Sequence, residues 1–132
     1  MCFTAPIHIK PRLLNSKKFY GYKVLFIDSN NNYRAPYKFS FHYEIDIPTP
    51  FIKLAPSFSS DEIDSVEFSI YEGYHFFTNI ESARIEQKDW GRWNKYIFTI
   101  FRIEVPIKTP FYIYKDEGIG VASSIIIKEM IE

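Results

Sequence analysis

The sequence predicts an α+β fold with a mostly antiparallel, curled or barrel-like sheet of about six strands and one short helix. Aromatic residues make up 19% of the 132-residue chain, and aromatic side chains favour strands. Apolar and polar residues alternate over residues 39–47, which is the period of a strand with one buried face. A pattern typical of a helix start lies at residues 78–81, with strand-like segments before and after it.

The strands are predicted from aromatic and β-branched runs that lie between turn residues. Residues 19–27 form the first strand, and the Asp, Ser and Asn residues of 28–32 turn the chain into an extended segment at 33–37. Segment 95–105 is apolar on both faces near its middle, which predicts a central place in the sheet. Strands are also expected over residues 39–47, 66–71, 74–77, 111–114 and 121–131.

A capping box at Thr78 and Glu81 predicts a short helix over about residues 79–90. In this motif the Thr78 hydroxyl accepts the Glu81 amide, and the Glu81 carboxylate reaches back to the Thr78 amide. Gly91 is expected to end the helix. Three residues are spaced to share its inner face: Ile80, Ala83 and Gln87.

The length predicts a single domain, residues 1–132, whose residues 1–18 form an extended N-terminal arm interrupted by Pro6 and Pro11. Cys2 is the one cysteine, which favours a reducing compartment. Charged residues and prolines interrupt the first segment, so we expect no signal peptide. No run approaches the ~20 apolar residues of a membrane span. The expected location is therefore the cytoplasm.

The charge balance bears on possible partners. Lys and Arg number 16, and so do Asp and Glu, which gives a formal net charge of zero. Proteins that bind duplex nucleic acid need a positive excess to displace counterions, so no duplex partner is expected. A net charge near zero also removes one barrier to self-association, which leaves a homo-oligomer open.

One candidate binding site is the junction between the strand at 74–77 and the helix. A helix N-terminus presents free amides that can hold an anion, and His75 and Thr78 lie at this junction. These residues would form the edge of a phosphate or nucleotide site, with His75 as a donor. The simpler interpretation is that Thr78 and Glu81 satisfy the helix end and that His75 is an ordinary strand residue.

Two basic and aromatic clusters are candidate interaction surfaces. The first, around Pro36, contains Tyr33, Arg34 and Tyr37; the second, at the expected end of the helix, contains Arg92 and Trp93. Such side chains stack on single-stranded bases and are enriched at protein interfaces. The alternative is that they close the core or lie in solvent. Trp90 is expected in the core, and the role of Trp93 stays open.

The sequence does not favour an enzyme. It contains no Gly-rich phosphate loop, serine nucleophile motif or paired catalytic carboxylates. The histidines His8, His42 and His75 are too far apart in sequence for a typical metal pattern. An N-terminal nucleophile at Cys2 is disfavoured because Phe3 follows it. No cofactor and no metal are therefore expected.

Three segments resemble a family of small uncharacterised bacterial and phage proteins. They are Gly21-Tyr22-Lys23-Val24, Tyr33-Arg34-Ala35-Pro36-Tyr37 and Gly73-Tyr74-His75-Phe76-Phe77, the last followed by Glu81 and Ala83. The resemblance covers the chain from about residue 19 onward. The family has no assigned activity, so it implies no catalytic residue. It points to a phage or to a bacterial host, as does the content of Ile, Lys, Asn, Phe and Tyr.

The sequence leaves three functional hypotheses open. The first is a non-enzymatic protein-binding module, such as a phage accessory or host-modulating (anti-defence) protein in the bacterial cytoplasm. The second is a small nucleotide-binding enzyme or sensor that uses the strand–helix junction at 73–82. The third is a structural component of a larger assembly such as a virion.

Overall fold

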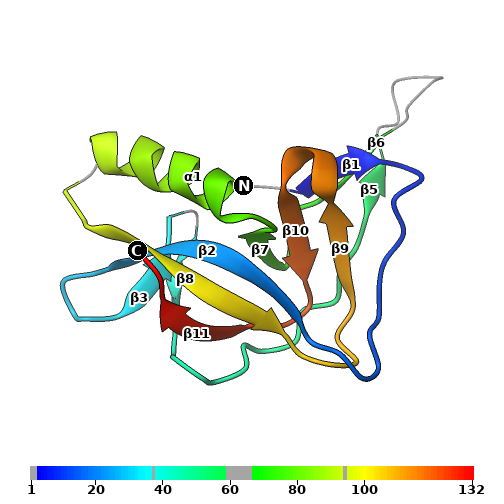
Figure 1. The fold of residues 1–132 in the computed structure, drawn as a ribbon, viewed down its shortest axis with the longest axis horizontal. Helices are drawn as coiled ribbons and strands as arrows, with labels where there is room; N and C mark the ends of the chain where they lie inside the picture. Colours follow the sequence, from blue (N-terminus) through cyan, green and yellow to red (C-terminus); the bar gives the residue numbers. More distant parts are fainter. Residues whose placement is uncertain (1–2, 37, 59–66, 94) are drawn as a thin grey trace.

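The computed structural model describes residues 3–36, 38–58, 67–93 and 95–132, and these residues form two sheets and one α-helix (Figure 1). Cys2 and Tyr37, on which predictions rest, lie outside the described residues, as does the first residue of the predicted strand 66–71. The strands are β1 Phe3–Pro6, β2 Phe19–Ile27, β3 Tyr33–Ala35, β4 Lys38–Tyr43, β5 Ser57–Phe58, β6 Glu67–Ile70, β7 Tyr74–Phe77, β8 Phe98–Val105, β9 Phe111–Tyr114, β10 Ile119–Ala122 and β11 Ile126–Met130. The α-helix is α1 Ile80–Trp93, and a 3-10 turn, η1 Lys115–Glu117, joins β9 to β10.

The larger sheet has eight strands within the described residues. Its order is β11-β8-β2-β7-β10-β9, and β3 and β4 continue from β2. A smaller sheet has the order β1-β6-β5. All of these strand pairs are antiparallel. The α+β class and the mostly antiparallel sheet are confirmed, but the prediction of about six strands is too low, since the described chain forms eleven strands in two sheets.

The larger sheet does not close, so the expectation of a barrel-like sheet is wrong. Its outer strands are β11 and β9, and each meets a segment from elsewhere in the chain. Ile45 forms a parallel bridge with Ile127 on β11, and Arg12 forms an antiparallel bridge with Phe111 on β9. If the sheet were closed, β11 and β9 would pair with each other. Instead, each of these edge strands is partly paired with one of these two segments.

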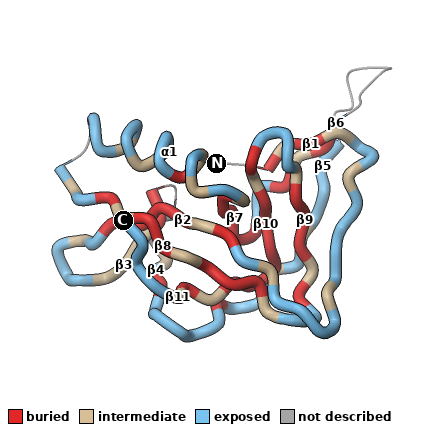
Figure 2. Tube along the Cα trace, in the orientation of Figure 1, coloured by how far each residue is buried: buried red, intermediate tan, exposed pale blue. Residues whose placement is uncertain are grey.

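Strand β8 lies between β11 and β2 and is buried on both faces, as its pattern predicts (Figure 2). Phe98 and Ile100 pack in the cluster that contains Ala83 of α1. Phe101 and Ile103 belong to the main core cluster on the other face. Because neither face is in water, apolar residues occupy consecutive positions here instead of alternating with polar ones.

The predicted strand over 39–47 is too long, because β4 ends at Tyr43. Asp46 has a φ of 64°, a left-handed conformation that takes the chain out of the strand direction. Ile45 and Ile47 are consequently exposed, although the alternation places them on the buried face.

The predicted strand over 121–131 is two strands, β10 and β11, which belong to distant parts of the larger sheet. Between them the backbone bonds to the segment around Thr49. The Thr49 amide donates to the Ile125 carbonyl at 2.9 Å, and the Ile52 amide donates to the Ser123 carbonyl at 2.9 Å. These long-range bonds take the place of a continuous strand ladder.

The predicted capping box does not form at the start of α1. Asn79 is the cap, because its Oδ1 accepts the Ser82 amide at 2.8 Å. The Glu81 carboxylate pairs with Arg84 of the same helix at 2.8 Å and so is not the reciprocal partner of Thr78. The helix starts close to the predicted place, but a neighbouring side chain caps it.

Gly91 does not end α1, which continues to Trp93. The Trp90 ring stacks on Phe98 at a centroid distance of 6.2 Å, so the last turns are packed against β8. Gln87 also faces the sheet, and its Nε2 donates to the Phe98 carbonyl at 2.8 Å. Among the described residues, no helix has the length and apolar character that crossing a membrane requires.

The first part of the predicted N-terminal arm is strand β1 of the smaller sheet. Phe3 is 1% exposed, and its ring lies 6.1 Å from Phe68 and 6.0 Å from Tyr112. This segment therefore belongs to the second hydrophobic cluster of the molecule.

Candidate functional site

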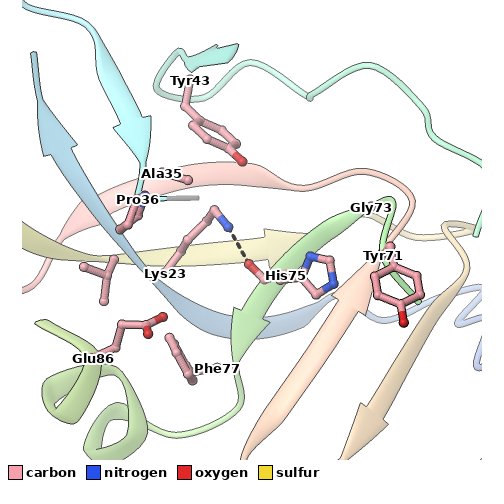
Figure 3. Close-up of a pocket in the computed structure, with 10 residues that line it drawn as sticks. Lys23, Ala35, Pro36, Tyr43, Tyr71, Gly73, His75, Phe77 and Glu86 are labelled. Carbon is pink, nitrogen blue, oxygen red and sulfur yellow. Dashed lines mark hydrogen bonds between the residues drawn. The ribbon is translucent and has the colours of Figure 1, made fainter. Parts of the chain in front are cut away.

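A cavity of about 220 Å³ lies where β2 and β7 separate (Figure 3). These two strands pair at a single position, Tyr22 with Phe77. Beyond that pair the ladder stops, and side chains instead of backbone bonds fill the space between the strands. The cavity is lined by Lys23, Val24, Ala35, Pro36, Tyr43, Tyr71, Gly73, His75, Phe77 and Glu86.

Lys23 carries a buried ammonium into the gap between the two strands. Its side chain is on β2, the residue is 8% exposed, and Nζ donates a hydrogen bond to the His75 carbonyl of β7. Nζ also lies 5.6 Å from the centroid of the Tyr43 ring. In a continuous ladder a backbone amide makes this kind of bond to a carbonyl. Here the lysine makes it, and its contacts offset the cost of several kcal/mol that burying an ammonium carries.

His75 lies on the wall of the cavity, but its ring points away from Lys23 and toward Tyr71 (Figure 3). Nε2 lies 3.0 Å from the Ile70 carbonyl oxygen. Because a carbonyl oxygen can accept but not donate, Nε2 must carry a proton. The ring is buried and held in one orientation by this bond.

The structure does not bring His75 and Thr78 together at an open helix end. The Thr78 amide donates to the Gly118 carbonyl at 2.9 Å, and the Ser82 amide is used by Asn79. Gly118 also covers this end, since a Cβ added there would lie 2.6 Å from Asn79 Nδ2 and Ser82 Oγ. The amides at residues 78 and 82 are therefore already bonded within the protein.

Tyr43 contributes a neutral hydroxyl to the opposite wall of the cavity. Burial raises the pKa of Tyr43, and the nearby Tyr74 raises it further. The Tyr43 ring packs at 4.9 Å from Phe41 and at 6.3 Å from Tyr74. The aromatic packing holds the Tyr43 ring in place. The raised pKa keeps its hydroxyl protonated at neutral pH.

Glu86 contributes a carboxylate from α1. It is half-buried, and Figure 3 shows it extending from the helix toward the strand that bears Lys23. The ammonium of Lys23 extends in a different direction, toward His75. The wall thus presents one cation and one anion at different places.

Tyr33 and Arg34 are held by contacts with other parts of the protein. Arg34 Nε bonds to the Asp28 carboxylate, and the Tyr33 ring packs edge-on against Phe101 at 5.1 Å. The residues that follow them, Ala35 and Pro36, line the cavity. The first predicted cluster is therefore next to the cavity, although its tyrosine and arginine do not line it.

Arg92 and Trp93 lie in the last turn of α1 and do not line the cavity. Trp93 is 83% exposed, whereas Trp90 packs into the protein as predicted. Ile97, four residues beyond Trp93, is 78% exposed. The second predicted cluster is thus an apolar and basic surface, separate from the cavity.

The sequence interpretation did not identify Lys23, Tyr43 or Glu86. Lys23 had a visible signal, because it is the single charged residue in the apolar strand FYGYKVLFI. A lone Lys in such a strand indicates a buried charge that needs a partner, since Lys is almost never fully buried unless it is paired. Tyr43 and Glu86 had no comparable signal, since a strand tyrosine and a helix glutamate are ordinary residues.

No group of three His, Cys, Asp or Glu side chains that could hold a metal ion occurs in the part of the chain that the structure describes. Comparisons with protein-family models, curated proteins and solved structures found no match to this chain.

Proposed function

We propose that this protein binds a small polar ligand in the cavity between β2, β7 and α1. The observation that carries the proposal is the buried ammonium of Lys23 at the cavity wall. An apolar side chain of similar length would fill this position without the desolvation cost of a charge. Ligand sites typically combine apolar walls with a few fixed polar groups, and this cavity has that composition.

The proposal is for binding and not for catalysis. His75 is the candidate general base on the wall, but its Nε2–H is bonded to the Ile70 carbonyl and its ring points away from Lys23. Such a histidine holds two backbone segments together.

The test is a thermal-shift screen of the full chain against nucleotides, ADP-ribose derivatives, organic acids and amino acids at millimolar concentration. A ligand that occupies the cavity raises the melting temperature, because it binds the folded state alone. We expect Lys23→Met to weaken its binding by roughly tenfold or more, as loss of a charged hydrogen bond does. Lys17→Met, at an exposed position, is the matched control. Equal affinity of wild type and Lys23→Met for every stabilising compound would contradict the proposal.

A second candidate function is protein binding at the end of α1. The exposed Trp93 supports it, together with Ile97 and the neighbouring Arg92, because Trp and Arg dominate interface hot spots. This candidate includes the roles of a phage accessory or host-modulating protein and of a component of a larger assembly. For a partner recovered from a bacterial host, Trp93→Ala should weaken binding by roughly thirtyfold or more, and Ile47→Ala should not. A Trp93→Ala protein with unchanged affinity would rule out this surface.

A further inference from the structure

We propose that a second cavity of this protein binds a small carboxylate with an apolar body, such as an aromatic acid or a short fatty acid. This cavity, which we name the Ser123 cavity, has a volume of about 230 Å³. It is lined by Pro11, Phe51, Lys53, Leu54, Pro110, Tyr112 and Ser123. Among the described residues it has no lining residue in common with the cavity at Lys23, so each cavity can bind its ligand independently.

Backbone hydrogen bonds between segments distant in the sequence hold the wall of the Ser123 cavity. The N-terminal arm runs along β9, because the Arg12 amide donates to the Phe111 carbonyl at 2.7 Å and the Phe111 amide donates to the Arg12 carbonyl at 3.0 Å (Figure 1). The Ser123 amide donates to the Pro110 carbonyl at 3.0 Å, and the Ser123 carbonyl accepts the Ile52 amide at 2.9 Å. The cavity is therefore formed by the fold itself, as ligand sites usually are.

Ser123 presents a buried hydroxyl that lacks a partner. The residue is 1% exposed, and its Oγ forms no hydrogen bond in the part of the chain that the structure describes. The hydroxyl of the next residue, Ser124, donates to the Thr49 carbonyl at 2.7 Å. Buried hydroxyls almost always have such a partner, because an unpaired one loses the hydrogen bonds that it makes with water. A bound molecule in the cavity would supply the partner that Ser123 lacks.

The other polar side chains of the wall favour an anion. Lys53 is exposed and forms no ion pair within the described residues, so it adds an uncompensated positive charge at the mouth of the cavity. Burial raises the pKa of Tyr112, so its hydroxyl keeps a proton that it can donate. The described wall contains no acidic side chain. Because a carboxylate only accepts hydrogen bonds, it complements a wall that offers hydroxyl donors and a cation.

The rest of the wall and the volume favour a small apolar body with one charge. Pro11, Phe51, Leu54 and Pro110 have apolar side chains. Because apolar cavities of roughly 150 Å³ hold a benzene molecule, a cavity of about 230 Å³ accommodates an aromatic ring or a short alkyl chain with its carboxylate. Phosphate groups fit less well, because their sites use several amides or cations. The described wall has one lysine and two prolines, and proline has no amide to donate.

The experiment measures the binding of benzoate, phenylacetate and hexanoate to the full chain by thermal shift, over millimolar concentrations at constant ionic strength. Each acid is compared with its primary amide, which has nearly the same size and no charge. We expect at least one acid to raise the melting temperature, because it binds the folded state. Its amide should bind roughly tenfold or more weakly, since hydrogen bonds to a charged group are stronger. The aromatic and aliphatic acids show which apolar body the cavity prefers.

Ser123→Ala is the sharpest variant, because opposite effects are expected in two measurements. Without ligand it should melt at a higher temperature than wild type, since it removes an unpaired buried hydroxyl. It should nevertheless bind the acid roughly tenfold or more weakly, since it lacks a hydrogen bond to a charged group. Lys53→Met should weaken binding roughly threefold, as loss of an exposed charge does, and the matched exposed variant Lys17→Met should bind like wild type.

The remaining outcomes would overturn the proposal. It is wrong if none of the three acids stabilises the protein, if each amide binds as tightly as its acid, or if Ser123→Ala retains the wild-type affinity. An acid that loses affinity in Lys23→Met but keeps it in Ser123→Ala and Lys53→Met binds in the cavity at Lys23. That result would support the proposed function and contradict a carboxylate site at Ser123.

Discussion

Asp28 shows how a single residue organises the turn between β2 and β3. Its carboxylate accepts the amides of Asn30 and Asn32 at 2.8 and 3.0 Å and bonds to Arg34 Nε. The bond to Arg34 is the largest cause of the lowered pKa of Asp28, followed by the bond to the Asn32 amide. The carboxylate is therefore ionised in the folded protein at pH values where it begins to be protonated in the unfolded chain.

This shift predicts a pH dependence of stability. Because the folded pKa of Asp28 lies below its ordinary value of 3.8, the contribution of Asp28 to stability is complete well above that pH and is lost as the pH falls through the folded pKa. Asp28→Asn should therefore lower the free energy of unfolding at neutral pH, and the difference from wild type should shrink in acid. Urea unfolding over a pH series measures both curves, with the exposed Asp116→Asn as control. Parallel curves for wild type and Asp28→Asn would contradict this account.

Helix α1 shows that packing can override a local stop signal. Gly91 has no left-handed φ and lies inside the helix. The contact between Trp90 and Phe98 stabilises the turn that contains it. A glycine inside a helix costs about 1 kcal/mol relative to alanine, a cost that burial of an aromatic side chain outweighs.

This position predicts a stabilising substitution. A Cβ added at Gly91 meets nothing within 4 Å, so Gly91→Ala should raise the free energy of unfolding by about 0.5–1 kcal/mol. Gly73→Ala is the opposite case, because its φ is 134° and its Cβ would lie 2.6 Å from Leu54. We expect Gly73→Ala to cost about 2 kcal/mol or more. Chemical denaturation of both variants measures the two effects, and a Gly91→Ala protein less stable than wild type would show that the helix ends earlier.

At the scale of the whole molecule, the N-terminal strand β1 completes one of the hydrophobic clusters. Strand β1 pairs with β6, and Phe3 packs between Phe68 and Tyr112, which lie on strands of different sheets. The smaller sheet is thereby attached to the larger one through an aromatic cluster. The predicted N-terminal arm therefore contains residues with very different importance for stability.

Two substitutions in this arm should differ sharply. Phe3→Ala leaves a cavity among buried rings and should cost about 3–5 kcal/mol. Leu13→Ala, at a position that is 53% exposed, should change the stability by about 0.5 kcal/mol or less. Equilibrium unfolding in urea gives both values. Similar values for the two variants would show that β1 is not part of the core.

The sequence by itself determined the class of the fold and the positions of most elements. Alternation and aromatic runs act between neighbouring residues, so they located the strand at 19–27 and the start of the helix near residue 80. They also located the strand predicted over 95–105, which begins three residues later, at Phe98. They could not reveal that 121–131 is divided between two strands, because bonds from Thr49 and Ile52, more than seventy residues earlier, divide it.

The tertiary structure decided how the strands are grouped and where the cavity lies. Lys23 and His75 are 52 positions apart in the chain, and they meet because β2 and β7 pair at one residue and then separate. No local pattern encodes such a separation, since it depends on which distant strand lies beside each edge. The cavity is therefore lined by His75, which the sequence indicated as a candidate. It is also lined by Lys23, Tyr43 and Glu86, whose place at the cavity only the tertiary structure shows.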